Sequence, residues 1–459
     1  MNDFRRTAGA LGVVAASLVS CGGGGGSSST TVTTSAVSAS AILDTTVPAT
    51  AATPGDGSPT GPAGWTADTS SCVDPARAEK PIEGEVRIGS AMPLSGGPAA
   101  AFKPVKDGFE LYINYADAQG LLPGYALSAD IRDDQYDGTQ TPGVVDGLID
   151  DGVDLFAGII GAPNNLAVRD SLNDACIPQL LALNGSPAWG EAADYPWTTG
   201  ALVPYDIESW VYATKLSELQ PNAQVAIFYV NNDFGKAYVD AFKAKADELG
   251  LVIVDEQAVE PDAYDPPTAQ VGSIAGHLPD AIVAVPLGLQ CPAFLTELGT
   301  AQALNQGWDP KVFVTNTCAS KLFFGLAGPA ADGIYSSNNL LDSNDPKTAS
   351  QPGVKTFLDA FAAAGLADDP AMTEAGWNVG EVTVAILDEA LKSGTLTRKS
   401  IIEAARNMTY TPTLARPAIQ YEMNGVDDAY AFQTLQVLQW NVESQTFTEI
   451  GEPISDFES

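Results

Sequence analysis

Few side chains in this sequence are suited to acid–base or nucleophilic chemistry. His277 is the single histidine of the chain, and its place just before the apolar stretch LPDAIV indicates the end of a helix rather than a catalyst. Glu374 and Glu381 are acids of the kind that a secreted glycosidase or esterase would use. They flank a predicted helix, AGWNVGEVTVAIL, and no other reactive group converges on them. We therefore expect no catalytic residues.

The acidic stretch DDQYDG (133–138) begins like the calcium loop of an EF-hand. That loop needs a bidentate Glu at its twelfth position. Counted from Asp133, the twelfth residue is Val144. We interpret the stretch as a solvated acidic turn, and the sequence predicts neither a metal nor a cofactor.

Uncharged polar groups, glycines and aromatic rings gather instead in loops that follow predicted strands. Several of these loops precede helix N-termini, which favour a carboxylate or another anionic group. They contain no nucleophile–base pair, so they indicate a recognition surface rather than a reaction site. The loops are PLSGGP (93–98), GAPNN (161–165), LNGSPAW (183–189), VNNDFG (230–235), PLGLQC (286–291) and TNTC (315–318).

Short apolar strands alternate with amphipathic helices from residue 85 onward, and the pattern restarts near residue 224. This alternation predicts an α/β fold with two lobes, each a parallel sheet covered by helices on both faces. Ligands of such sheets bind beyond the carboxyl ends of the strands. A helix is expected at 234–249, ended by Gly250. The expected strands are 86–94, 125–134, 154–161 and 177–183, then 224–230, 251–259, 280–287 and 311–316.

The chain's length and charge limit its organisation and its partners. Its 459 residues exceed what one hydrophobic core usually organises, which also favours two lobes. The 22 Lys and Arg against 57 Asp and Glu give a net charge of −35. Such a surface repels phosphate backbones and anionic lipid headgroups, so we expect no nucleic-acid partner.

The first residues have the composition of an export signal. Residues 1–20 combine an Arg pair with a short apolar run, and LVSC at 18–21 resembles the lipobox of bacterial lipoproteins. That resemblance implies cleavage before Cys21 and lipidation of its thiol; an ordinary signal peptide is the alternative. The route, general secretory or twin-arginine, stays open. Residues 21–83 are rich in Gly, Ser, Thr, Ala and Pro, and we expect a flexible linker there.

The ordered series MPLSGG, DDQYDG, GIIGAPNN, IPQLLALNGSPAW, VNNDFGKAY and AADGIYSSN resembles the leucine/isoleucine/valine-binding proteins over about 84–450. The resemblance implies a type I periplasmic binding fold of two Rossmann-like lobes. A three-segment hinge joins the lobes, and the ligand lies between them. Carried over, lobe 1 takes 84–203 and 334–417, and lobe 2 takes 204–333 and 418–459.

The resemblance also implies which residues contact ligand, although the match is uneven. Phe234 stands where the family often has a tyrosine, so the ring is kept without its hydroxyl. Asn316 or Thr317 stands where many members have the acid that holds the ligand ammonium. Because an unpaired buried ammonium is costly, an uncharged or singly anionic ligand suits this chain at least as well as an amino acid. The candidate ligand residues are Ser95, Gly96, Asn164, Asn165, Asn184, Gly185, Ser186, Trp189, Phe234, Leu287, Asn316 and Thr317.

Four cysteines remain after Cys21, and they allow three pairings. Cys291 and Cys318 both follow strands of the second lobe. Cys72 precedes the first strand and Cys176 the fourth, at the opposite end of the first lobe. We predict the disulfides Cys72–Cys176 and Cys291–Cys318, which an oxidising exterior permits. Free buried thiols are the alternative.

Together these features predict a solute-binding receptor of an ABC importer rather than an enzyme. We expect a monomer that is exported, is held at the outer face of the cell membrane by lipidated Cys21, and delivers a small organic solute to permease subunits. The solute is an amino acid or an amide- or carboxylate-like compound. A ligand-sensing module of a signalling complex is the alternative, and a secreted hydrolase is a weaker one.

Overall fold

A computed structural model describes residues 64–367 and 370–455. The expected signal segment 1–20 and the expected lipidation site Cys21 lie outside these residues. Within the described ranges, no helix is both long enough and apolar enough to cross a membrane.

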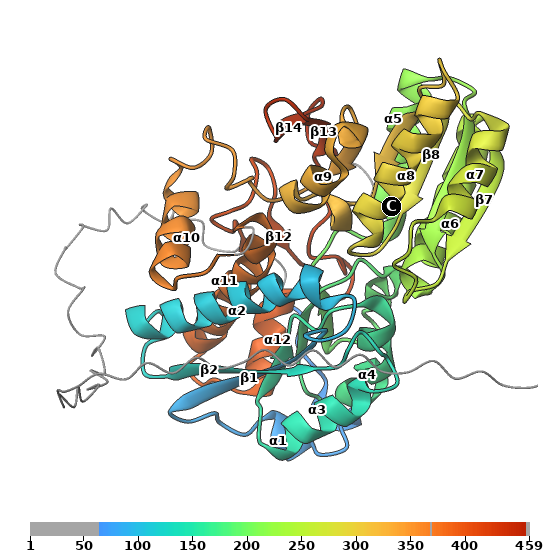
Figure 1. Ribbon diagram of the computed structural model, residues 1–459. Coiled ribbons are helices and arrows are strands. Elements are labelled where there is room, and N and C mark those ends of the chain that lie inside the picture. Colours follow the sequence, from blue (N-terminus) through green and yellow to red (C-terminus); the bar gives the residue numbers. More distant parts are fainter. Residues whose placement is uncertain (1–63, 368–369, 456–459) are drawn as a thin grey trace, which may run out of the picture. The chain divides into compact units, whose positions relative to one another are not determined.

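The first sheet has five parallel strands in the order β2-β1-β3-β4-β5. This order places α2 on one face and α3 and α4 on the other (Figure 1). The strands are β1 (Glu85–Met92), β2 (Ala126–Asp133), β3 (Leu155–Ala157), β4 (Gln179–Ala182) and β5 (Thr198–Gly200). The helices that accompany this sheet are α2 (Ala99–Gln119), α3 (Thr141–Asp150), α4 (Ala162–Asp174), α10 (Pro352–Ala363), α11 (Pro370–Lys392) and α12 (Arg398–Arg406).

Helices α2 and α11 pack unusually closely because glycines face the partner helix. An ideal Cβ on Gly376 of α11 would lie 1.8 Å from the carbonyl oxygen of Val105. A Cβ on Gly108 of α2 would lie 1.9 Å from the carbonyl oxygen of Thr373. Any larger residue at either position would push the helices apart. Both helices contribute to the candidate site, so this contact fixes the spacing of two of its walls.

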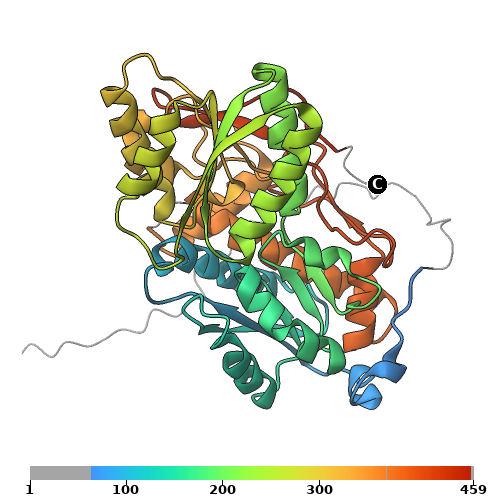
Figure 2. The same cartoon turned by 90° about the vertical axis from the view of Figure 1, so that its right-hand side faces the viewer.

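The second sheet has seven strands in the order β14-β13-β10-β9-β8-β6-β7. Its central strands are parallel, and β13 and β14 run antiparallel at one edge. Figure 2 shows its long strands between flanking helices. The strands are β6 (Gln224–Val230), β7 (Val252–Val259), β8 (Ala281–Val285), β9 (Lys311–Val314), β10 (Tyr335–Ser337), β13 (Val437–Asn441) and β14 (Thr446–Glu449). The helices are α5 (Tyr205–Leu219), α6 (Asp233–Leu249), α7 (Thr268–His277), α8 (Gln290–Leu304) and α9 (Lys321–Ala327).

These elements confirm the predicted two-lobed α/β fold with parallel sheets. Each sheet with its helices is called a lobe below, lobe 1 for the first and lobe 2 for the second. The strand expected at 224–230 is β6 itself, and the expected helix 234–249 is α6 with one residue added at its start. All described residues belong to one compact unit, and the largest hydrophobic core includes Phe109 of lobe 1 and Tyr212 of lobe 2.

The chain crosses between the lobes three times, but two crossings lie later than expected. The second was expected near 333/334, yet β10 pairs with β9 and β13 and so belongs to lobe 2. The third was expected near 417/418. There β11 (Thr409–Tyr410) pairs with β12 (Tyr421–Glu422), and the Tyr421 hydroxyl donates to the Ala405 carbonyl of α12 at 2.6 Å. Lobe 1 therefore continues through β12 before the chain returns to β13.

The prediction of a flexible linker over residues 21–83 is wrong for residues 64–83. Trp65 exchanges hydrogen bonds with the Asn407 side chain, its N–H donating to Oδ1 at 2.8 Å and its carbonyl accepting from Nδ2 at 2.7 Å. The segment then forms a short 3-10 turn (Thr69–Ser71) and α1 (Pro75–Ala78). The Ile82 N–H donates to the Leu396 carbonyl at 2.9 Å. A few anchoring residues in a linker-like composition thus hold 64–83 on lobe 1.

Both predicted disulfides are present. Cys72–Cys176 joins the N-terminal segment to the end of α4, and Cys291–Cys318 joins the loops after β8 and β9 in lobe 2. All four cysteines are buried, and Cys72 is the most exposed of them at 7%.

Replacing both cysteines of the long-range pair with alanine should destabilise the protein more than replacing both of the short-range pair. The disulfides close loops with sequence separations of 104 and 27 residues. By the loop-entropy argument each disulfide stabilises the folded protein by roughly 3–5 kcal/mol. Cys72–Cys176 contributes about 1 kcal/mol more than Cys291–Cys318, because its loop is longer. Urea unfolding of the two double variants measures this difference. An equal or smaller loss for Cys72→Ala/Cys176→Ala would contradict it.

Candidate functional site

A cavity of about 190 Å³ lies at the carboxyl ends of the strands, between elements of both lobes. Its walls come from α2 and α11 of lobe 1, from loops of both lobes and from the segments that cross between them. The lining residues are Phe102, Val105, Tyr136, Ile160, Gly161, Leu183, Ala201, Leu202, Val203, Tyr205, Phe234, Leu287, Asn316, Thr317, Ala319, Asn338, Asn339, Leu340, Ala371, Met372, Ala375, Asn378, Val379, Pro412, Ala415, Ile419 and Phe432.

Aromatic rings form two contacting pairs in this lining. Phe102 and Tyr136 stack with ring centroids 6.0 Å apart and planes inclined by 4°. Tyr205 and Phe234 lie at 4.7 Å between centroids, tilted by 55°. Rings at these distances attract each other and offer flat apolar surfaces. Burial raises the pKa of the Tyr136 hydroxyl, so both lining tyrosines stay uncharged at neutral pH.

Four lining residues each hold an oxygen that is shielded from solvent and has no hydrogen-bond partner in the protein. These atoms are Asn316 Oδ1, Thr317 Oγ1, Asn339 Oδ1 and Asn378 Oδ1. Asn316 and Thr317 follow β9, Asn339 follows β10, and Asn378 lies in α11. Buried polar groups in proteins are almost always hydrogen-bonded. These four side chains therefore hold unused hydrogen-bonding capacity beside the cavity.

The cavity includes four of the predicted ligand residues. Phe234 reaches it from the first turn of α6, and Leu287 from the loop after β8. Asn316 and Thr317 reach it from a single 3-10 turn (Asn316–Cys318). All four lie beyond the carboxyl ends of lobe 2 strands, where ligands of such sheets bind, and their contact with ligand stays a prediction.

Three predicted asparagines lie behind the cavity wall rather than in it. Asn164 Nδ2 donates to Asp134 Oδ2 and to Thr141 Oγ1, both at 2.9 Å. Asn165 Nδ2 donates to the Ile159 and Gly161 carbonyls at 2.7 and 2.9 Å. Asn184 Oδ1 accepts from the Ser186 N–H at 3.0 Å. These amides hold the loops of two lining residues, Gly161 and Leu183, so their contribution is support.

The other predicted ligand residues also lie outside the lining. Ser95 and Gly96 are exposed, and the Ser95 hydroxyl donates to the Asp133 carboxylate. Gly185 leaves no room for a side chain, since a Cβ there would lie 2.5 Å from the Val203 carbonyl oxygen. Ser186 caps the turn Pro187–Gly190. Trp189 is buried and donates through Nε1 to the Asn184 carbonyl at 3.2 Å.

The prediction that the acidic turn DDQYDG is solvated is wrong for its second residue, Asp134. Asp134 is fully buried and accepts hydrogen bonds from the Tyr136 N–H at 3.1 Å and from Thr141 Oγ1 and Asn164 Nδ2 at 2.9 Å. Burial raises the pKa of its carboxyl. Three donors compensate this acid, and the turn that it organises places Tyr136 in the cavity.

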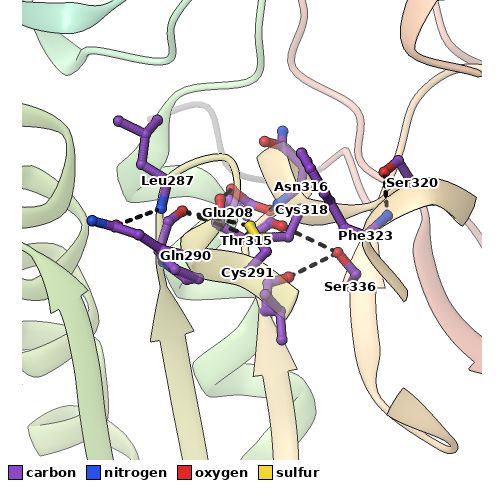
Figure 3. Close-up of a disulfide and its surroundings, with 12 residues drawn as sticks. Glu208, Leu287, Gln290, Cys291, Thr315, Asn316, Cys318, Ser320, Phe323 and Ser336 are labelled. Carbon is purple, nitrogen blue, oxygen red and sulfur yellow. Dashed lines mark hydrogen bonds between the residues drawn. A yellow bond between two sulfur atoms is a disulfide. The ribbon is translucent and has the colours of Figure 1, made fainter. Parts of the chain in front are cut away.

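A buried carboxylate, Glu208 of α5, lies beneath the loop that carries Asn316 (Figure 3). Glu208 Oε1 accepts from the Asn316 N–H at 2.7 Å, and Oε2 accepts from Thr315 Oγ1 at 3.2 Å. The Ser337 and Tyr212 hydroxyls donate to Oε1 at 2.7 and 2.9 Å. Burial raises the pKa of Glu208. A single acid thus ties α5, β10 and the loop after β9 together.

The same loop is fixed from its other side by the disulfide. Cys318 ends the turn that carries Asn316, and Cys291 lies in the first turn of α8, shortly after Leu287 (Figure 3). Gln290 accepts from the Leu287 N–H at 3.0 Å. The two lining loops of lobe 2 are therefore covalently linked at the base of the cavity.

The acids Glu374 and Glu381 lie within α11 rather than flanking it, and both are buried. Glu381 accepts from the Tyr410 hydroxyl, the Thr413 N–H and the Thr413 hydroxyl, each at 2.8 Å. It therefore ties α11 to the segment around β11. His277 ends α7 as expected.

Several lining residues had no separate signal in the sequence. Asn378 lies in AGWNVGEV, which we interpreted only as a helix. Asn338 and Asn339 follow the YSS of β10; Asn338 ends the motif AADGIYSSN, which we used only for the resemblance, and Asn339 lies directly after it. Tyr136 lies in the turn that we interpreted as solvated. Phe102 lies shortly after the loop PLSGGP. We predicted ligand contacts in that glycine-rich loop and not at the aromatic ring that follows it.

Two sheets of mainly parallel strands, joined by three crossings and with a cavity at their strand ends, define a solute-binding protein of the periplasmic binding type. A family model described as periplasmic binding protein matches residues 85–445, and the protein belongs to that family. This membership confirms the predicted solute-binding role and implies an extracytoplasmic location.

Individual relatives agree with the resemblance seen in the sequence. A Leu/Ile/Val-binding protein homolog 2 of Brucella abortus is 24% identical over 279 residues, which are 60% of this chain and 72% of the relative. The structure of a branched-chain amino acid ABC transporter from Thermus thermophilus with bound valine aligns with a TM-score of 0.73 at 18% identity, covering 82% of this chain and 97% of that one. A solute-binding protein from R. palustris in complex with 4-hydroxybenzoate aligns at 0.67 and 17% identity, covering 81% and 97%.

The substitution Glu208→Gln should change the pH dependence of stability. A raised pKa means that the folded protein holds this proton more tightly than the unfolded chain. The stability that Glu208 contributes is present below its ordinary pKa and is lost as pH rises through the raised value. The melting temperature of the variant minus that of the wild type should therefore increase from pH 4 to pH 7.

The matched control is Glu218→Gln on the same helix, whose side chain is 60% exposed and pairs with Lys215 at the surface. Its melting-temperature difference should stay nearly constant over this range. A Glu208→Gln difference that does not change with pH would contradict the burial argument.

Proposed function

We propose that the protein is a lipid-anchored extracytoplasmic receptor that captures a small organic solute and delivers it to the permease of an ABC importer. The cavity between the two lobes is the observation that carries this proposal. In our proposal the receptor acts as a monomer. The comparisons support a transport role, since relatives of similar fold are named as ABC transporter binding proteins.

Closure of the lobes over the solute is the proposed mechanism. Phe102 and Asn378 contribute to the cavity from lobe 1, and Phe234 and Asn316 contribute from lobe 2. A solute contacts all of them only when the lobes are together. It therefore favours the closed state by the contacts that the open state lacks, and the permease reads that state.

Binding without chemistry fits the composition of the site. Among the lining residues the structure describes, none is an acid, a histidine, a cysteine or a lysine. Thr317 is the hydroxyl in the lining that resembles a nucleophile, and no base accompanies it there. We accordingly propose that the solute leaves the cavity unchanged.

The substitution Ala375→Phe should abolish solute binding without unfolding the protein. Ala375 lies in α11 and lines the cavity, so a phenyl ring there occupies the space of the solute. A thermal-shift screen of the wild type with amino acids, amides and small carboxylates identifies a stabilising solute, which at 100 times its Kd adds about 2.7 kcal/mol. The variant should lose that shift. Small-angle scattering should show the solute reducing the radius of gyration of the wild type only.

Ala363→Phe is the control, because Ala363 ends α10 at an exposed position. This variant should bind like the wild type. If no solute in a broad library stabilised the wild type, or if Ala375→Phe bound as well as Ala363→Phe, the proposed role of the cavity would fail.

Lipid anchoring through Cys21 is the second part of the proposal, and the lipobox-like LVSC supports it. Cys21→Ala should abolish the incorporation of labelled fatty acid into the full-length protein in the expressing bacterium, because the substitution removes the thiol that is acylated. Metabolic labelling followed by immunoprecipitation measures this. A wild type that takes up no label, or a variant that takes up as much as the wild type, would contradict the anchor.

A further inference from the structure

We infer that the solute is uncharged: a compact apolar body, such as a ring or a branched alkyl group, that carries a neutral hydrogen-bonding group such as a primary amide or a hydroxyl. This inference rests on the proposed function, because it names the class of ligand for the same cavity. It differs from valine, which is zwitterionic, and from 4-hydroxybenzoate, which is anionic, the ligands bound to two of the structural relatives.

The first observation is that no described lining residue carries a charge. A buried ion without a partner of opposite charge costs several kcal/mol after the protein has relaxed. An ammonium in this cavity would find amide and hydroxyl oxygens but no carboxylate. A carboxylate would find no Arg or Lys among the described residues of the lining.

Three charged groups that adjoin lining residues already have partners in the protein. Glu208 lies behind Asn316 and accepts four hydrogen bonds from the protein. Asp134 lies behind Tyr136 and accepts three. Arg416, next to the lining residue Ala415, pairs with Glu449 at 2.6 Å, and its Nε is buried without a hydrogen-bond partner. Glu449 already balances the charge of Arg416, so none of these three groups is a free counter-charge.

The start of α4 also disfavours an anion. Gly161 lines the cavity there, and helix N-termini attract negative charge. An ideal Cβ on Gly161, however, would lie only 2.4 Å from Asn164 Oδ1. That oxygen has no hydrogen-bond partner in the protein. Its partial negative charge lies against the helix start, where a carboxylate would bind.

The second observation is the set of unpartnered polar groups in the lining. Asn316, Thr317, Asn339 and Asn378 each present a buried oxygen without a partner. Asn316 and Asn378 also carry an NH₂, and the two ends of an amide exchange on rotation about its terminal torsion. These two residues can therefore both donate to and accept from a neutral group, whereas Asn339 Nδ2 already donates to the Thr434 carbonyl at 2.9 Å. A primary amide or a hydroxyl needs both.

The third observation is size. A cavity of about 150 Å³ lined by apolar side chains holds benzene, and this cavity has about 190 Å³. It therefore fits one small ring or a branched chain together with one polar group. The stacked Phe102 and Tyr136 and the Tyr205–Phe234 pair supply flat apolar surfaces for that body.

Probes of one shape and different charge test the inference. One set is benzamide, benzoate and benzylamine, and the other is isobutyramide, isobutyrate and isobutylamine. Calorimetric titration of the mature protein at pH 7 should show at least one amide binding at least tenfold more tightly than both charged members of its set. A carboxylate or an amine that binds as tightly as its amide would overturn the inference while leaving the proposed function intact.

Absence of binding by all six probes would also overturn the inference, because it would remove this class of ligand. The proposed function falls separately, and only if the broad solute screen shows no ligand of any class.

A charge placed in the cavity gives a second test. Asn378→Asp keeps the shape of the side chain and should weaken binding of the preferred amide at least tenfold, while binding of the matching amine improves. The control, Asn222→Asp, places the same charge at an exposed turn in lobe 2 and should leave both affinities unchanged. If Asn378→Asp bound the amide like the wild type, Asn378 would not contact the solute and the inference would fail.

Discussion

The carboxylate of Glu208 is the constraint on which the base of the site depends. An acid that is fully buried needs donors around it, and here they come from α5, β10 and the turn after β9. Since these donors belong to separate segments, satisfying one side chain sets the position of all of them. Asn316 and Thr317 are held in the cavity wall as a result. The Cys291–Cys318 disulfide adds a covalent limit to the same turn, so the lobe 2 side of the site is rigid before any solute arrives.

The lobe 1 side gains its rigidity from backbone contact rather than from a charge. Gly108 and Gly376 allow α2 and α11 to approach until carbonyl oxygens occupy the space of side chains. Phe102 and Asn378 therefore face the cavity from helices that cannot slide independently. Ligand recognition then depends on how the two rigid sides meet, which agrees with a protein that responds to its solute by moving lobes rather than by reshaping loops.

The sequence predicted the fold well because the strands of a buried parallel sheet are continuous apolar runs. The strand at 224–230 shows this clearly, since its ends coincide with the predicted ones. The disulfide pairs also followed from the strand order. The cavity followed only in part: Phe234, Leu287, Asn316 and Thr317 lie at predicted loops, whereas Asn378 lies in a helix whose pattern resembles ordinary core. Its role comes from packing against α2, and no local pattern encodes that contact.

The number of charged residues in a stretch of sequence also did not predict its exposure to solvent. Asp134 belongs to an acidic run and looked solvated, but Thr141 and Asn164 supply donors that the run itself lacks. Composition was also misleading for residues 64–83, which have the composition of a flexible linker. Trp65 and Asn407, which are 342 positions apart, hold that segment in place. In each case the deciding partner is distant in the chain, so a reading of neighbouring residues could not find it.

The attachment of 64–83 has a mechanical consequence. Asn407, Leu396 and Cys176, which receive this segment, all belong to lobe 1. A membrane tether that ends there would pull on one lobe alone and leave the other free to swing. Opening and closing would then neither stretch nor slacken the tether. If the protein is anchored as proposed, its affinity for solute would be the same in the anchored and the released form, and tension on the anchor would not act as an effector.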